Sequence, residues 1–154
     1  MMEKKQLPNT LFFTWVEEEI AQSHQVRIRL IGTSMNPFLR NGISEVVLVP
    51  CKPEELKLLD VVLFRYRGGH VLHRIVRITP DGYTLQGDGV WASCEQCTAT
   101  DIVARVAYVY RTPQKRLSVT SLSWRLYSKI WHFLRPVRRW LLRLYFLLWR
   151  KHAI

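Results

Sequence analysis

The sequence predicts a mainly β fold, an antiparallel sandwich or open barrel, followed by a basic amphipathic helical appendage. Short apolar runs separated by turn residues recur through residues 26–111, a pattern typical of such β folds. From residue 121 onward the apolar residues instead recur at helical spacing. With 48% hydrophobic residues in 154, the chain can form a real core, and its length suits one domain plus an appendage.

A short helix is expected at residues 11–23, because Asn9 or Thr10 can cap its start. It belongs to a helical lead-in that we place at residues 1–25. The apolar run 11–16 stops at three glutamates, so it is too short for a signal peptide or a spanning helix.

Strands are predicted throughout the domain that we place at residues 26–111. The first is clearest, since Val26, Ile28 and Leu30 alternate with arginines. The predicted strands are residues 25–31, 45–49, 60–66, 71–78, 83–86 and 102–110. A hairpin at Gly68 and Gly69 joins the third to the fourth, and prolines and glycines separate the others.

The C-terminal part is predicted as a linker, residues 112–120, and a basic amphipathic tail, residues 121–154. Pro136 divides the tail into helical pieces at 121–134 and 137–151. Its apolar stripe and its four tryptophans favour a membrane interface. The residues of that pattern are Trp124, Tyr127, Ile130, Trp131, Leu134, Val137, Trp140, Leu141, Leu144, Leu148 and Trp149.

Charge is divided unevenly along the chain. The net charge is +11, yet all twelve acidic residues lie between Glu3 and Asp101, and twelve of the 23 basic residues follow them. A basic segment needs an anionic partner, either nucleic acid or an anionic lipid surface. We favour a membrane surface bound through Trp124–Lys151 over nucleic acid, because nucleic acid would leave the tryptophans and leucines without a partner.

Three motifs supply residues suited to nucleophilic catalysis. They read GTSMNP at 32–37, HRIV at 73–76 and GDG at 87–89. A serine hydroxyl becomes a good nucleophile when a histidine takes its proton, and a carboxylate then holds the imidazole and stabilises its charged form. Ser34, His73 and Asp88 can fill these three roles.

These motifs and their order resemble the signal-peptidase family of serine peptidases, in its endoplasmic-reticulum and archaeal branch. That branch has Gly-Ser-Met-x-Pro at the nucleophile, His-Arg-Ile/Val at the base and Gly-Asp-Asn at the acid. Residues 59–64, LDVVLF, are also similar to the Gly-Asp-Ile-Val strand of the family. Bacterial signal peptidases and LexA-like autoproteases resemble this branch in fold but have a lysine at the position of His73. The resemblance covers residues 26–109 and implies a fold of the signal peptidase/LexA type.

The resemblance implies that Ser34 is the nucleophile, His73 the general base and Asp88 the acid. Glu95 is the reserve acid, since the acidic pair that follows in the family falls near Cys94 and Glu95. The asparagine that the family has after its aspartate is Gly89 here, and its small hydroxyl residue two before the nucleophile is Gly32.

The resemblance also implies the surroundings of the nucleophile. Met35 and Pro37 would shape the substrate cleft, while the Ser34 backbone N–H, with the Thr33 hydroxyl, would hold the oxyanion. The expected substrate is an extended signal or leader peptide, or a protein that carries one, with small side chains near the cut.

Family members usually enter the membrane through a helix before the serine, and here the tail is expected to replace it as a peripheral anchor. The expected location is the cytoplasmic side of a bacterial inner membrane, with a transporter as a possible partner. Two alternatives remain: an inactive homologue that only binds peptides, and a LexA-like regulator with nucleic-acid affinity through its tail.

No metal or other cofactor is expected. Cys94 and Cys97 have the spacing of half a zinc site, but a structural site needs two more ligands and no second pair exists. Cys51 and His70 would join them only by an accident of folding. The three cysteines are an odd number, which argues against a disulfide framework and favours a reducing compartment.

Overall fold

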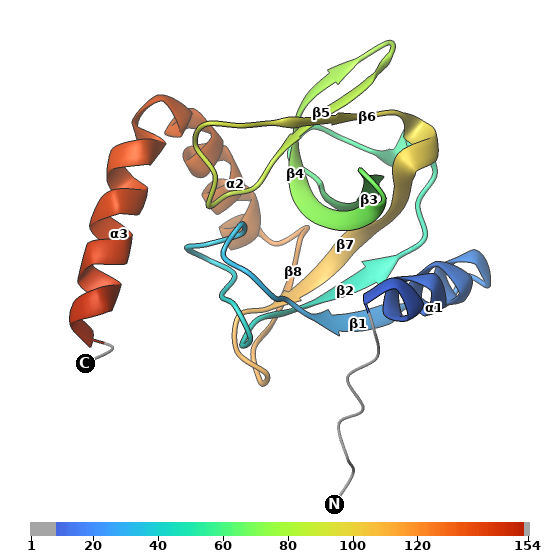
Figure 1. The fold of residues 1–154 in the computed structure, drawn as a ribbon, viewed down its shortest axis with the longest axis horizontal. Coiled ribbons are helices and arrows are strands. Elements are labelled where there is room, and N and C mark those ends of the chain that lie inside the picture. Colours follow the sequence, from blue (N-terminus) through green and yellow to red (C-terminus); the bar gives the residue numbers. More distant parts are fainter. Residues whose placement is uncertain (1–8, 153–154) are drawn as a thin grey trace, which may run out of the picture.

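A computed structural model describes residues 9–152 of the chain. A helix, α1 (Asn9–Ala21), leads into one antiparallel sheet that curls into a half-barrel, and two helices, α2 and α3, follow it (Figure 1). The strands are β1 (Val26–Arg29), β2 (Glu45–Val49), β3 (Val61–Tyr66), β4 (Gly69–Thr79), β5 (Gly82–Gln86), β6 (Glu95–Cys97), β7 (Ile102–Tyr110) and β8 (Arg116–Ser118). The helices after them are α2 (Leu122–Phe133) and α3 (Arg138–His152), and the 3-10 turns are η1 (Pro53–Glu55), η2 (Ala99–Asp101) and η3 (Arg135–Val137).

The sheet has the order β1-β2-β7-β3-β4-β5-β6, and β8 adds to β7. Every strand pairing is antiparallel. The prediction of a mainly β, antiparallel fold with C-terminal helices is therefore confirmed. The lead-in was placed at residues 1–25, of which 1–8 lie outside the described residues.

Two strands were not predicted, β6 and β8, and each has only three residues. β8 lies inside the predicted linker, so that segment is part of the sheet and the linker prediction is wrong there. Neither strand shows the alternation that marked the others, because β8 has no buried residue and β6 has only Cys97. Both depend on a longer neighbour, β5 or β7, for their backbone hydrogen bonds.

The curled sheet encloses two clusters of buried apolar side chains, and β3 contributes to both. Leu63 faces the first cluster, where it packs with residues of α1, β2 and β7. Val62 and Phe64 face the second, which also contains Ile75 of β4 and Leu85 of β5. Successive residues of a strand point to opposite faces, so a strand buried on both sides reads as a continuous apolar run.

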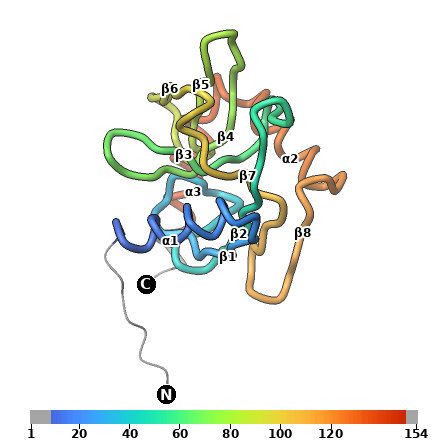
Figure 2. Tube along the Cα trace, turned by 90° about the vertical axis from the view of Figure 1, so that its right-hand side faces the viewer, coloured from blue at the N-terminus to red at the C-terminus, as the bar shows by residue number. Residues whose placement is uncertain are grey.

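Helix α2 is part of the domain core, which corrects the expectation that the whole tail forms a separate appendage. Trp124 is buried in the first cluster with Tyr127 packed against it, and Trp131 is also buried. Figure 2 shows α2 and β8 on the same side of β7. Two of the four tryptophans that were expected at a membrane interface therefore face the protein.

A break between the tail helices is present where it was predicted, at the short turn η3, which contains Pro136. Beyond it, α3 runs along one side of the molecule (Figure 1). Of the helices in residues 9–152, none combines the length and the apolar character needed to cross a membrane.

Candidate active site

The turn that carries Ser34 begins directly beyond β1. Gly32 has a φ of +99°, a left-handed conformation that glycine adopts without strain, and its N–H donates to Asn41 Oδ1 at 2.8 Å. The Asn36 N–H donates to the Thr33 carbonyl at 3.1 Å, which closes the turn. Met35 is buried in the first core cluster and anchors the turn, so the half-buried Ser34 is held at a fixed place.

His73 lies in the middle of β4 and is buried. Its Nδ1 forms a hydrogen bond and ion-pair contact with Glu95 Oε2 at 2.8 Å. Glu95 is the first residue of β6, which reaches β4 through β5, so the sheet itself sets this contact. A carboxylate on Nδ1 fixes the imidazole orientation and favours the tautomer whose Nε2 can accept a proton.

The loop after β5 packs its backbone directly onto the serine turn. The Gly89 N–H donates to the Ser34 carbonyl at 2.8 Å. A Cβ added to Gly87 would collide with the Ser34 carbonyl and lie 2.9 Å from His73 Nε2. The Ser34 carbonyl and His73 Nε2 therefore both lie close to Gly87.

The backbone at Gly89 leaves no room for a side chain. A Cβ there would collide with the Thr33 carbonyl and lie 3.3 Å from the Asn36 nitrogen. The two backbones are too close for a side chain, so an asparagine at this position would push the loop away from the serine turn.

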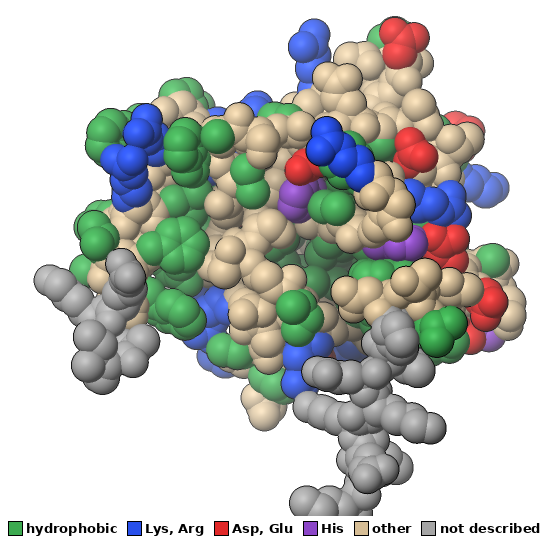
Figure 3. Space-filling view, in the orientation of Figure 1, with side chains coloured by type: hydrophobic (Ala, Val, Ile, Leu, Met, Phe, Trp, Pro, Cys, Tyr) green, Lys and Arg blue, Asp and Glu red, His purple; other side chains and the backbone are tan. Residues whose placement is uncertain are grey.

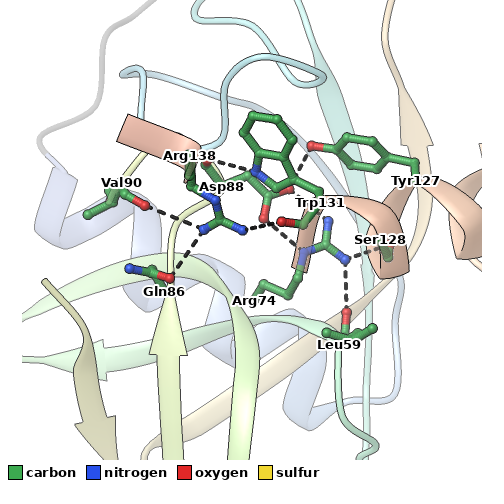
Figure 4. Close-up of polar contacts among 9 residues, drawn as sticks. All are labelled: Leu59, Arg74, Gln86, Asp88, Val90, Tyr127, Ser128, Trp131 and Arg138. Carbon is green, nitrogen blue, oxygen red and sulfur yellow. Dashed lines mark hydrogen bonds and ion pairs between the residues drawn. The ribbon is translucent and has the colours of Figure 1, made fainter. Parts of the chain in front are cut away.

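Asp88 is held elsewhere, which corrects its assignment as the acid that orients His73. Its carboxylate accepts two hydrogen bonds from Arg74, from Nε and Nη2, both at 2.8 Å. Tyr127 donates to the same carboxylate at 2.9 Å, and Trp131 Nε1 donates to the Asp88 carbonyl at 2.9 Å (Figure 4). The structure thus pairs His73 with the reserve candidate, Glu95, and pairs Asp88 with Arg74.

The Arg74–Asp88 pair is almost wholly excluded from water, since each residue is 1% exposed. Burial opposes the charge of Arg74, but the Asp88 carboxylate outweighs it and raises the pKa of the guanidinium. Burial, together with Asp88, also raises the pKa of Tyr127, so the phenol stays protonated and donates its hydrogen bond.

Two further contacts fix the guanidinium of Arg74: its Nη1 donates to the Leu59 carbonyl at 3.0 Å and to Ser128 Oγ at 2.7 Å. Arg138, at the start of α3, adds a second buried guanidinium that bonds Gln86 Oε1 at 3.2 Å and the Trp131 carbonyl at 2.9 Å (Figure 4). Residues from both tail helices therefore anchor this part of the chain, α2 at Asp88 and α3 at the flanking Gln86 and Val90.

Sequence reasoning missed Arg74, Tyr127 and Trp131 as partners of this loop. One signal was present: Arg74 stands between apolar residues in a strand, where a charge is rarely buried without a partner. The apolar stripe of the tail gave no way to tell which tryptophans face the body.

Ser34 lies on the wall of a groove of about 900 Å³. Met35 also lines it, whereas Thr33 and Pro37 are not among its lining residues. Phe12 and Phe13 of α1 contribute to the groove, as do Arg27, Ile28 and Arg29 of β1. The groove is thus largely apolar close to Ser34.

The cysteines of the candidate zinc motif have different surroundings. Cys97 is buried, and burial raises the pKa of its thiol to about 12, while Cys94 is exposed. Residues 9–152 contain no group of three or more metal-ligating side chains.

Comparison with family models, with curated proteins and with solved structures found no match to this chain. The resemblance to signal peptidases therefore rests on the sequence motifs alone.

Proposed function

We propose that this chain is a serine endopeptidase in which Ser34 is the nucleophile, His73 the general base and Glu95 the carboxylate that orients the base. The observation that carries the proposal is the position of His73. Its Nδ1 is bonded to a carboxylate, while its Nε2 lies beside Gly87, against which the Ser34 carbonyl also packs. Serine activation needs Nε2 to reach the Ser34 hydroxyl, and the packing of the Ser34 carbonyl and of Nε2 close to the same glycine supports that.

In the proposed reaction, His73 Nε2 takes the proton of Ser34 Oγ as the oxygen attacks a peptide carbonyl. Glu95 stabilises the imidazolium that forms, and the imidazolium then gives its proton to the leaving amine. The Ser34 backbone N–H, with the Thr33 hydroxyl, would stabilise the negative oxygen of the tetrahedral intermediate. A water activated by His73 finally releases the acyl group from Ser34.

An extended peptide fits the surroundings of Ser34. Within residues 9–152, β1 pairs with one strand only, β2, so its other edge is open for main-chain hydrogen bonds to a substrate strand. The groove along β1 offers apolar walls for alternate side chains. We propose that the substrate is a signal or leader peptide with small residues near the cut, and that the curled sheet is of the signal peptidase/LexA type.

The test is cleavage of a panel of signal and leader peptides by the full chain in detergent. Ser34→Ala and His73→Ala should abolish cutting that the wild type shows. Ser123→Ala and His24→Ala, which change an exposed serine and an exposed histidine, serve as matched controls and should cut normally. A serine-directed phosphonate should label the wild type and the controls but not Ser34→Ala.

The main alternative is a catalytically inactive protein that binds peptides without cleaving them. Peptide binding by the wild type, with no cleavage and no phosphonate labelling, would overturn the peptidase proposal in favour of that alternative. Cleavage that survives Ser34→Ala would also overturn it.

A further inference from the structure

The outward side of α3 carries an apolar row. Trp140, Leu144, Leu147 and Leu148 are each between 52% and 62% exposed, and their spacing of three or four residues places them on one face. On the opposite face Arg138 and Leu142 are buried in the first part of the helix, while Trp149, further along, is 52% exposed. A surface helix normally points its polar side to water, so an apolar row on the water side indicates a missing partner.

Helix α2 repeats this arrangement. Leu122, Leu126, Ile130 and Phe133 follow one another at helical spacing and are between 48% and 82% exposed. Its inner face carries the buried Trp124, Ser128 and Trp131. We call these two apolar rows, on α2 and α3, the outer rows.

Only positive charge accompanies the outer rows. Arg125 and Lys129 stand beside the row of α2, and Arg139 and Arg143 beside that of α3, all exposed. Arg139 and Arg143 lie over the Trp140 ring, at 5.5 Å and 5.4 Å from its centroid. None of these four side chains forms an ion pair with another residue in 9–152.

A cleft of about 560 Å³ lies between α2, β7 and the turn before β3. Four basic side chains line it, and Asp60 is the one acidic residue among them. The basic residues are Lys57, Arg105, Arg125 and Lys129. Because Arg125 and Lys129 belong both to this cleft and to the border of the α2 row, an anionic group could enter the cleft while apolar chains contact the row.

We propose that the outer rows dock on an anionic phospholipid surface, with acyl chains against the rows and headgroup phosphates against the flanking cations. Aromatic and aliphatic side chains on one side, bordered by lysine and arginine, are the pattern of helices that lie in a membrane interface. The charges argue against a second copy of the chain, because two such faces would bring like charges together. Figure 3 shows hydrophobic and basic side chains mixed on the surface over α3.

The test is co-sedimentation of the full chain with vesicles of phosphatidylcholine, with and without phosphatidylglycerol. The wild type should bind the mixed vesicles and bind pure phosphatidylcholine much less, with binding reduced by salt. Trp140→Ser combined with Leu144→Ser should lower the affinity at least about tenfold, since each removes apolar area from the bilayer contact. Ile78→Ser, an exposed apolar residue at the end of β4, is the matched control and should bind as the wild type does.

Charge reversal separates the electrostatic part of the interaction. Arg139→Glu with Arg143→Glu should remove the preference for phosphatidylglycerol, while Arg67→Glu at the β3–β4 hairpin should leave it in place. Equal vesicle binding by the wild type and the Trp140/Leu144 variant would overturn the proposal. So would a dimer in sedimentation velocity that this variant abolishes, or binding to duplex DNA in place of vesicles. None of these readouts depends on peptidase activity.

Discussion

His73 and Arg74 are neighbours on β4, yet their side chains reach different partners on opposite sides of the strand. His73 contacts Glu95 of β6, whereas Arg74 forms its two-point ion pair with Asp88 in the loop after β5. Successive side chains of a strand point to opposite faces, so the two neighbours face different partners. One strand thus supports the proposed chemistry on one side and the anchor of the active-site loop on the other.

Replacing Glu95 by glutamine should impair catalysis without unfolding the protein. The variant keeps the size of the side chain but loses the charge that stabilises the imidazolium, so we expect kcat to fall roughly 10²- to 10⁴-fold. Single-turnover cleavage measures the loss, and the thermal unfolding midpoint verifies the fold. Wild-type turnover in Glu95→Gln would exclude Glu95 as the orienting acid.

Asp88→Asn should instead act on stability. It leaves the Arg74 guanidinium buried without its counter-charge, a change that costs about 3–5 kcal/mol of unfolding free energy. Urea unfolding measures this cost. Glu19→Gln removes the exposed partner of His24 and should change the same quantity by less than about 0.5 kcal/mol. An equally small effect of Asp88→Asn would contradict the anchoring role.

Gly87→Ala should separate the serine turn from the imidazole. The new Cβ collides with the Ser34 carbonyl and crowds His73 Nε2, so the loop or the ring must move. We expect phosphonate labelling of Ser34 to slow at least about tenfold, because nucleophile activation depends on this geometry. Gly69→Ala is the control: its Cβ would meet only the Tyr66 carbonyl at 3.7 Å, and labelling should be unchanged.

The ion pair between Glu17 of α1 and Arg65 of β3 should weaken in acid. A hydrogen bond from Arg65, helped by His70, lowers the pKa of Glu17 from 4.5 to about 2. A carboxyl whose pKa is depressed by folding stabilises the fold fully above pH 4.5 and loses that contribution as the pH falls toward 2. Unfolding midpoints between pH 2 and 6 should therefore fall less steeply for Glu17→Gln than for the wild type. If the unfolding midpoints of Glu17→Gln and of the wild type fell equally with pH, the stabilising role of ionised Glu17 would be contradicted.

The larger strands and the antiparallel class were predictable because their apolar patterns are long enough to be distinctive. The three-residue strands β6 and β8 were not, since their existence depends on neighbours that the local sequence does not reveal. The partners of the candidate site residues also depended on neighbours that the local sequence does not reveal. Ser34 and His73 could be proposed from their motifs, but the choice between Asp88 and Glu95 depended on which face of β4 each approaches. The pairing of Asp88 with Arg74, and its hydrogen bonds from Tyr127 and Trp131, showed that Asp88 belongs to the other side.

The hydrogen bond from Trp131 to the Asp88 carbonyl also has a consequence for biosynthesis. The chain is made from its N-terminus, so Ser34, His73 and Glu95 leave the ribosome well before α2 does. Arg74 can pair with Asp88 as soon as both have emerged, but the hydrogen bonds from Tyr127 and Trp131 to Asp88 form only when residues 122–133 have emerged and packed. A nascent chain should therefore hold all three residues of the proposed triad before these two hydrogen bonds exist, and it should gain full activity only once α2 has packed.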